Sequence, residues 1–93
     1  MRRKLLRSSS FVRAARRIIK KSPGCAQDLR ATLDLLFADA FDPRLRTHRL
    51  KGPLASSWAC SVGYDIRIVF AFVEWEGKEA ILLQTVGTHE EVY

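Results

Sequence analysis

Two histidines, one aspartate and two basic side chains in this sequence have the chemistry to act together on a phosphate. His48 and His89 are the only histidines in the chain, and Lys51, Asp65 and Arg67 lie between them. Imidazoles and carboxylates transfer protons in general acid–base catalysis. Fixed cations stabilise the negative charge that develops in a transition state. If the fold brings these residues together, they predict proton transfer around a phosphodiester.

Each of these residues also has a structural interpretation. A loop histidine such as His48 is more often a hydrogen-bonded surface residue than a catalyst, and His89 could simply end a strand. Asp65 follows a glycine-containing turn, where aspartate is common for its own backbone hydrogen bonds. Arg67 is more informative, because a charge within an apolar strand is costly unless Asp65 or a C-terminal glutamate pairs with it.

The first half of the chain has the apolar spacing of two helices. After a short strand at residues 4–7, three serines offer N-caps for a helix. Ser22-Pro23-Gly24 breaks this helix, and we expect Ser22 to cap a second helix with Pro23 at its first position. Apolar residues recur at helical intervals, as Phe11, Ala15, Ile18 and Ile19 in the first helix and as Ala26, Leu29, Leu33, Leu36 and Ala40 in the second.

The second half changes to the two-residue alternation of strands. The expected elements, in order, are a loop (44–57), a strand (58–62), a turn (63–64), a strand (65–73), a hairpin loop (74–78) and a last strand (80–86). This order predicts an α+β fold. A short N-terminal strand and a two-helix hairpin would pack on one face of a small antiparallel sheet.

The uncovered face of this sheet is where we expect the chemistry-bearing residues to meet. Asp65 and Arg67 have the same strand parity and therefore point the same way. His89 follows the last strand beside them, and His48 and Lys51 precede the first strand of the meander. One cleft is expected to collect all five side chains.

Length and charge describe one small domain with a basic first half. A chain of 93 residues supports a single core, so residues 1–93 are expected to form one domain. Residues 1–51 carry 14 basic and 4 acidic side chains, whereas residues 52–93 carry 2 and 6, which gives the net charge of +6. The basic face of the first helix is either a solvated surface or a polyanion-binding surface. Its residues include Arg13, Arg16, Arg17 and Lys20.

Membrane, secreted and metal-binding classes find little support in the sequence. No apolar run reaches the ~20 residues that cross a bilayer. The charged N-terminus lacks the apolar segment of a signal peptide, so we expect a cytoplasmic protein without a membrane partner. The two cysteines, Cys25 and Cys60, usually stay reduced in such a chain, and their spacing relative to the histidines fits no zinc motif. We expect neither a metal nor a cofactor.

Four motifs in the second half of the chain carry a family resemblance. They are His48-Arg49-Leu50-Lys51-Gly52-Pro53-Leu54, Ser57-Trp58, Asp65-Ile66-Arg67-Ile68-Val69-Phe70 and Gly87-Thr88-His89. Together they resemble the RelE/ParE toxin superfamily, and its YafQ-like mRNA interferase branch in particular. The resemblance extends over nearly the whole chain in the order of elements and over residues 48–93 in sequence.

This resemblance implies the toxin of a type II toxin–antitoxin pair, which cuts mRNA on the ribosome and has a cognate antitoxin as partner. In that branch the RNA 2′-hydroxyl attacks the adjacent phosphate without a metal, leaving a 2′,3′-cyclic phosphate and a 5′-hydroxyl. By motif match His48, Asp65 and His89 would transfer protons, and Arg67 would stabilise the phosphate. The residues expected to contact RNA or its phosphates are Lys51, Arg49, Tyr93, Arg13, Arg16, Arg17 and Lys20.

The sequence departs from the family pattern at three places. Ser61-Val62 stand where YafQ-like members can carry another histidine. Gln84-Thr85-Val86 stand where some RelE-type members have a second arginine, and Ser56-Ser57 replace a frequent glycine. The acid–base assignment therefore stays open, with either Asp65 or His48 as acceptor of the 2′-hydroxyl proton.

Two other functions fit the same fold. A ParE-like inhibitor of DNA gyrase would need no acid–base residues. A non-catalytic RNA- or ribosome-binding module would need only the basic surface. Fold alone does not decide among these functions, and the two histidines and Asp65 favour the nuclease.

Overall fold

Five strands form one sheet in the computed structural model, which describes residues 2–52 and 56–92. They are β1 (Leu5–Arg7), β2 (His48–Arg49), β3 (Trp58–Val62), β4 (Ile66–Trp75) and β5 (Lys78–Thr88), and the sheet order is β1-β5-β4-β3-β2. β1 runs parallel to β5, whereas the other neighbouring strands are antiparallel. The predicted α+β fold is confirmed, with a mixed sheet in place of a wholly antiparallel one.

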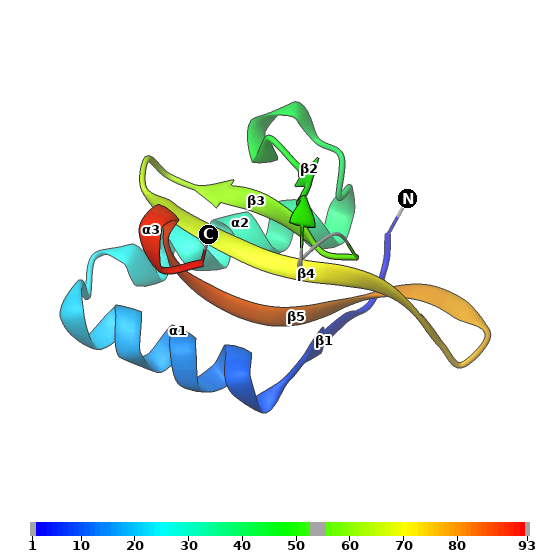
Figure 1. Cartoon of the computed structure of the whole chain (residues 1–93), viewed down its shortest axis with the longest axis horizontal. Helices are drawn as coiled ribbons and strands as arrows, with labels where there is room; N and C mark the ends of the chain where they lie inside the picture. Colours follow the sequence, from blue (N-terminus) through cyan, green and yellow to red (C-terminus); the bar gives the residue numbers. More distant parts are fainter. Residues whose placement is uncertain (1, 53–55, 93) are drawn as a thin grey trace.

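Two helices cover one face of this sheet, as expected from the apolar stripes. α1 (Ser9–Lys21) lies against β5 and α2 (Cys25–Ala38) against β3 (Figure 1). The first of the three serines is the N-cap of α1, because the Ser8 hydroxyl accepts a hydrogen bond from the Phe11 N–H at 3.0 Å. The main core lies between helices and sheet and includes Phe11, Leu29, Leu36, Ile68, Phe70, Ile81 and Leu83.

Ser22 ends α1 and does not cap α2, so that prediction is wrong. Its backbone N–H donates to the Ile18 carbonyl at 2.9 Å, which makes Ser22 the C-cap of α1. The chain then turns, and α2 begins at Cys25, whose N–H donates to the Ser22 carbonyl at 2.9 Å. Ser22 therefore closes one helix, and its side chain makes no capping bond to the next.

The segment expected to be a loop contains two short elements, the 3₁₀-helix η1 (Pro43–Leu45) and β2. β2 pairs with β3, with His48 opposite Ala59. Leu45 and Leu50, before and after β2, are buried. Elements of two or three residues are too short to show a periodicity, which is why the sequence pattern misses them.

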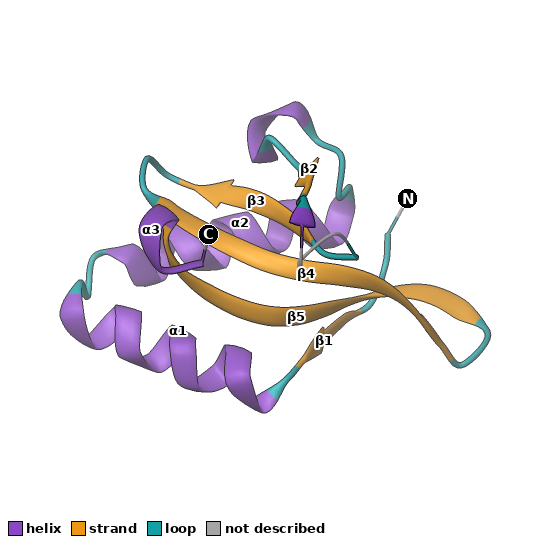
Figure 2. Cartoon of the chain, viewed as in Figure 1, coloured by secondary structure: helices purple, strands orange, loops and turns teal. Residues whose placement is uncertain are grey.

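A bulge in β5 sets which residues face the helices. Val69 lies opposite Thr85, but Phe70 lies opposite Leu83, so Gln84 is an extra residue in the ladder. This shift allows both Leu83 and Val86 to reach the main core. The β4–β5 hairpin itself ends in a tight turn far from the C-terminal helix α3 (His89–Val92), as Figure 2 shows. In the described segments no helix is both long and apolar enough to cross a membrane.

Candidate active site

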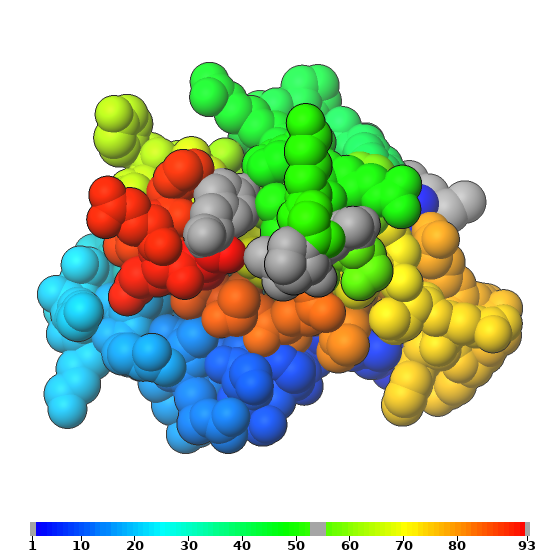
Figure 3. Space-filling model, viewed as in Figure 1, coloured from blue at the N-terminus to red at the C-terminus, as the bar shows by residue number. Residues whose placement is uncertain are grey.

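The sheet face opposite α1 and α2 carries a small apolar cluster that anchors the C-terminal helix. Ala59 of β3 and Val69 of β4 are buried with Leu50, and Val92 of α3 (His89–Val92) packs against them. Figure 3 shows α3 in red, the β3–β4 turn in yellow-green and the η1–β2 segment in green on this side of the molecule. These three segments surround the candidate site.

A cavity of about 660 Å³ lies between these segments, within the size range of small-molecule sites. Three of the four residues predicted to be catalytic, Asp65, Arg67 and His89, line it. Arg44 and Arg46 also line it. The cavity therefore collects guanidinium groups from two distant segments together with the carboxylates of Asp65 and Glu90 and one imidazole.

Backbone pairing between β4 and β5 holds Asp65, Arg67 and His89 close together. The His89 N–H donates to the Asp65 carbonyl at 2.8 Å, which continues the β4–β5 ladder beyond its last pair. Arg67 lies opposite Gly87 in the same ladder. Asp65 itself stands in the turn before β4 and not inside the strand, because β4 begins at Ile66. The prediction that Asp65 and Arg67 share one side is unaffected, since both line the cavity.

Arg67 is held by carbonyl groups and not by a carboxylate. Its Nη1 donates to the Tyr64 carbonyl at 3.1 Å and to the Ile66 carbonyl at 3.0 Å. Within residues 2–52 and 56–92, Arg67 forms no salt bridge, so the expected pairing with Asp65 or a C-terminal glutamate is not found. A guanidinium has five N–H donors. Those of Nε and Nη2 make no hydrogen bond to the described residues and suit a phosphate.

His48 is not among the residues that line the cavity. It is exposed on β2, and its Nδ1 lies 3.0 Å from the Arg46 carbonyl. Its pairing partner Ala59 lies opposite Val69, which places His48 two strands from β4, or about 10 Å between backbones. Both imidazoles lie on the uncovered face of the sheet, but only His89 joins Asp65 and Arg67.

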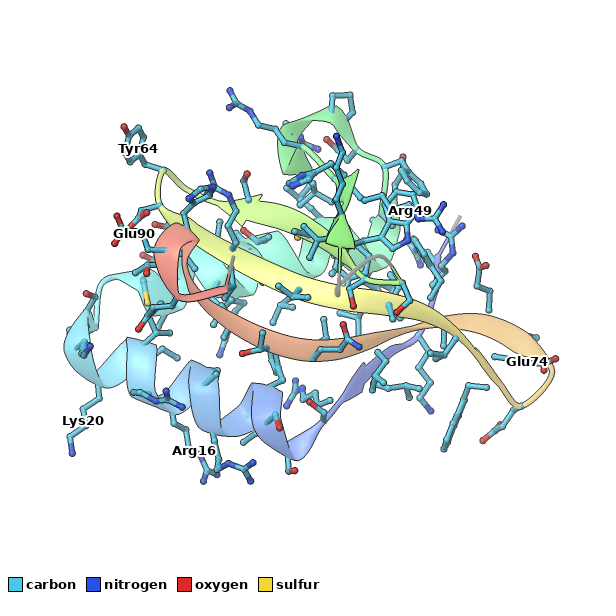
Figure 4. All side chains as sticks on the ribbon, viewed as in Figure 1. Arg16, Lys20, Arg49, Tyr64, Glu74 and Glu90 are labelled. Atoms are coloured by element: carbon cyan, nitrogen blue, oxygen red, sulfur yellow. The ribbon has the colours of Figure 1, made fainter. Side chains whose placement is uncertain are left out.

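The residues expected to bind RNA are spread over several surfaces. Lys51 and Arg49 are exposed near His48. Arg13 and Arg17 line a second cavity, between α1 and α3, whereas Arg16 lines a groove between α1 and α2. Lys20 and Arg16 point outward from α1 (Figure 4). Tyr93 lies outside the described residues.

Burial makes Cys60 chemically inert beside the cavity. Its side chain is fully buried, and this burial raises the pKa of the Cys60 thiol to about 12, although the charge of Arg67 partly opposes the shift. At neutral pH the group is a thiol, which is a poor nucleophile and a poor metal ligand. Cys60 and Cys25, which is also buried, are both free cysteines.

Arg44, Arg46 and Tyr64 line the cavity but were missed in the sequence. Arg44 and Arg46 flank the buried Leu45 in the segment expected to be a loop. The Arg44 guanidinium donates two hydrogen bonds to the Asp42 carboxylate, at 3.0 and 2.8 Å, and its backbone N–H donates a third at 2.9 Å. These bonds, the side-chain ones above all, lower the pKa of the Asp42 carboxyl to about 2. Two arginines spaced by one residue in a basic segment were the only available signal.

A capping box fixes α3 and with it His89. The Glu91 carboxylate accepts from the Thr88 N–H at 2.8 Å, and the Thr88 hydroxyl accepts from the Glu91 N–H at 3.3 Å. The backbone hydrogen bond from Thr88 is the main cause that lowers the pKa of Glu91, and the charges of Lys21 and Arg17 add to it. The pattern Thr-x-x-Glu is visible in the sequence and would have predicted this helix start.

Replacing Gly87 with alanine is expected to destabilise the fold and push α3 away from the sheet. A Cβ at this buried position would lie 3.1 Å from Glu91 Oε1 and 3.2 Å from Val92 Cγ1. Such overpacking typically costs about 1–3 kcal/mol of unfolding free energy, which urea denaturation would measure. Gly24→Ala is the matched control, because its Cβ would meet nothing within 4 Å. Equal stability of both variants would contradict this account.

No protein-family model and no curated protein sequence matches this chain. Solved structures do. YafQ from E. coli strain BL21(DE3) is 14% identical with a TM-score of 0.78, covering 98% of both chains. The YoeB/ParE toxin from Agrobacterium tumefaciens is 14% identical with a TM-score of 0.74, covering 92% of this chain and 98% of that one.

A third neighbour is the E. coli DinJ–YafQ toxin–antitoxin complex, at 15% identity and a TM-score of 0.76, covering 100% of this chain and 99% of that one. At these identities the likeness establishes the fold. The chain has the fold of the YafQ and YoeB/ParE toxins, which is the fold expected from the resemblance of the four sequence motifs.

Proposed function

We propose that this chain is the toxin of a type II toxin–antitoxin pair, and that it acts as an endoribonuclease on mRNA held by the ribosome. The observation that carries the proposal is the single cavity lined by Asp65, Arg67 and His89. The fold of the YafQ and YoeB/ParE toxins supports the toxin class. The acid–base set supports the nuclease over a gyrase inhibitor, which would need no such residues.

The proposed reaction is an in-line attack of the RNA 2′-oxygen on the neighbouring phosphorus. Asp65 accepts the 2′-hydroxyl proton as the 2′-O–P bond forms. Protonated His89 donates a proton to the 5′-oxygen as the P–O5′ bond breaks, and Arg67 stabilises the charge on the phosphorus centre. The products are a 2′,3′-cyclic phosphate and a 5′-hydroxyl. We assign the base to Asp65 and not to His48 because Asp65 lines the cavity with Arg67 and His89.

The ribosome is proposed to orient the substrate, so free mRNA should be cut slowly. The exposed basic residues of α1 would bind ribosomal RNA through its phosphates. The test is to incubate the purified chain with one defined mRNA, either free or in a reconstituted translation reaction, and to assay gyrase supercoiling in parallel. Cleavage of translated mRNA alone supports the proposal. Inhibited gyrase with intact mRNA would replace it with the ParE-like function.

The proposed antitoxin partner is a small acidic chain that covers the groove between α1 and α2. This groove has a volume of about 840 Å³ and an apolar floor that includes Phe11, Leu29 and Leu33. The cations at its edge are Lys4, Arg7, Arg16 and Arg30, against the single acid Asp34. An apolar floor with a basic rim fits an amphipathic, acidic segment.

Reversing two rim charges is expected to weaken antitoxin binding by about tenfold or more, because like charges would then face the partner. The variant is Lys4→Glu with Arg30→Glu, and the binding partner is the protein encoded by the adjacent short reading frame. Titration calorimetry would measure the affinity, with Lys78→Glu on the β4–β5 hairpin as the control for reversing a charge at a remote site. Unchanged binding by the double variant would place the antitoxin elsewhere.

A further inference from the structure

An exposed tyrosine stands at the edge of the cavity, where the chain turns from β3 to β4. Tyr64 is 97% exposed, although a tyrosine ring is normally at least partly covered. In Figure 4 it extends away from the body of the molecule at the same end as Glu90 and opposite to Glu74. The backbone of Tyr64 is held in place, since its carbonyl accepts a hydrogen bond from Arg67 Nη1 at 3.1 Å.

Arg44 and Arg46, on the η1–β2 segment, line the same cavity but differ in whether an acidic side chain pairs with them. Arg44 is paired with Asp42, whereas Arg46 forms no salt bridge within the described part of the chain. Arg46 also has a left-handed backbone, with φ of +53° and ψ of +40°. Such a conformation is costly for a residue other than glycine and tends to persist at functional sites. The buried Leu45 and the hydrogen bond from His48 to the Arg46 carbonyl hold this segment in place.

We propose that Tyr64 and Arg46 form a subsite for the nucleotide next to the scissile phosphate, with the base stacked on the Tyr64 ring and the phosphate bound by Arg46. This rests on the proposed endoribonuclease function, in which Arg67 holds the scissile phosphate. Aromatic rings stack on any base, and fixed cations follow the backbone of single-stranded nucleic acid. Arg67 is hydrogen-bonded to the Tyr64 carbonyl. The scissile-phosphate site at Arg67 and the flanking subsite at Tyr64 therefore have a fixed spacing.

The cavity is large enough for this arrangement and presents guanidinium groups that can bind phosphates. Its volume of about 660 Å³ exceeds what one phosphate group needs. The guanidinium groups of Arg46 and Arg67 line it together with the carboxylates of Asp65 and Glu90, and the third guanidinium, of Arg44, is paired with Asp42. Stacking on Tyr64 would be tolerant of sequence, so the subsite is expected to add affinity with little base preference.

The test is binding of a fluorescein-labelled, fully 2′-O-methylated penta-adenylate, which cannot undergo 2′-hydroxyl attack. Tyr64→Ala is expected to weaken binding roughly 5- to 150-fold, the loss that corresponds to one stacked base. Tyr64→Phe keeps the ring and should stay within about twofold of the original chain. Trp75→Ala removes another exposed aromatic side chain, on the remote β4–β5 hairpin, and serves as the matched control.

The variant Arg46→Gly removes the positive charge without straining the backbone, so its effect on binding can be separated from an effect on stability. Glycine accepts the left-handed backbone at this position, so the melting temperature should not fall. The affinity for the same probe should fall, and the slope of log affinity against log salt should decrease by about 0.7, the value for one phosphate contact on a single strand. Lys78→Gln is the charge-matched control. An unchanged salt slope in Arg46→Gly would remove Arg46 from the subsite.

A set of probes with one abasic position each identifies the stacked base. For the original chain, one of these abasic probes should bind more weakly than the complete probe. For Tyr64→Ala, that same abasic probe should bind as well as the complete probe. Any of three results would overturn the subsite. The first is that the losses of affinity caused by Tyr64→Ala and by the abasic position add at every position of the probe. The others are unchanged binding by Tyr64→Ala and no measurable binding to the original chain. If the Tyr64-dependent binding holds but translated mRNA stays intact, the nuclease proposal fails and the subsite stands. If translated mRNA is cleaved at a rate that depends on neither Tyr64 nor Arg46, the subsite fails and the nuclease proposal stands.

Discussion

His89→Ala is expected to lower the rate of mRNA cleavage by roughly 10²–10⁴-fold, the contribution of one general acid. The side chain is exposed, and the backbone N–H that donates to the Asp65 carbonyl at 2.8 Å remains in the variant. Stability should therefore change little, and lost activity would report on chemistry. The measurement is cleavage of a translated mRNA together with growth arrest on expression.

A second substitution makes the His89 result specific. His48→Ala removes the same imidazole from β2, and His48 is not among the residues that line the cavity. We expect this variant to retain most of its activity. His89→Gln, which keeps a polar side chain but cannot act as an acid, should resemble His89→Ala. Full toxicity of both His89 variants would remove His89 from the reaction.

Arg67→Gln is expected to reduce cleavage by about 10²-fold or more, because it removes the cation that we propose stabilises the phosphorus centre. Arg67→Lys should recover only part of this loss. An ammonium is a point charge without the planar fork of a guanidinium, which here uses Nη1 for the Tyr64 and Ile66 carbonyls and has Nε and Nη2 for phosphate.

The readout for Arg67 is the single-turnover rate of cleavage at saturating substrate, measured beside the unfolding free energy. Lys78→Gln is the control, since it removes one positive charge from an exposed residue that begins β5 and does not line the cavity. A purely structural role for Arg67 would appear as lost stability with a normal rate in the folded fraction. A normal rate for Arg67→Gln would contradict the proposed mechanism.

Much of this fold follows from patterns that the sequence displays openly. The helical spacing of Phe11, Ile18, Leu29 and Leu36 predicts two helices, and all four side chains are buried. The alternation through β3 and β4 predicts the sheet and places Ile68 and Phe70 in the core. These patterns persist over ten or more residues, so that periodicity is a reliable guide to them.

The parts that could not be predicted depend on short elements and on register. β2 has two residues, and its pairing decides that His48 lies opposite Ala59 and away from the cavity. The bulge at Gln84 has no sequence signature, yet it changes which side of β5 faces the helices. Arg44 and Arg46 reach the cavity only because η1 and a left-handed residue fold that segment over the sheet.

The chemistry of the cleaved ends tests the central claim most directly, namely that Asp65, Arg67 and His89 act together on one phosphodiester. Translated mRNA treated with the original chain should yield an upstream fragment with a 2′,3′-cyclic phosphate and a downstream fragment with a 5′-hydroxyl. The same reaction with His89→Ala should yield neither fragment above background. Fragments with a 3′-hydroxyl and a 5′-phosphate, or identical ends at an undiminished rate from His89→Ala, would contradict this mechanism.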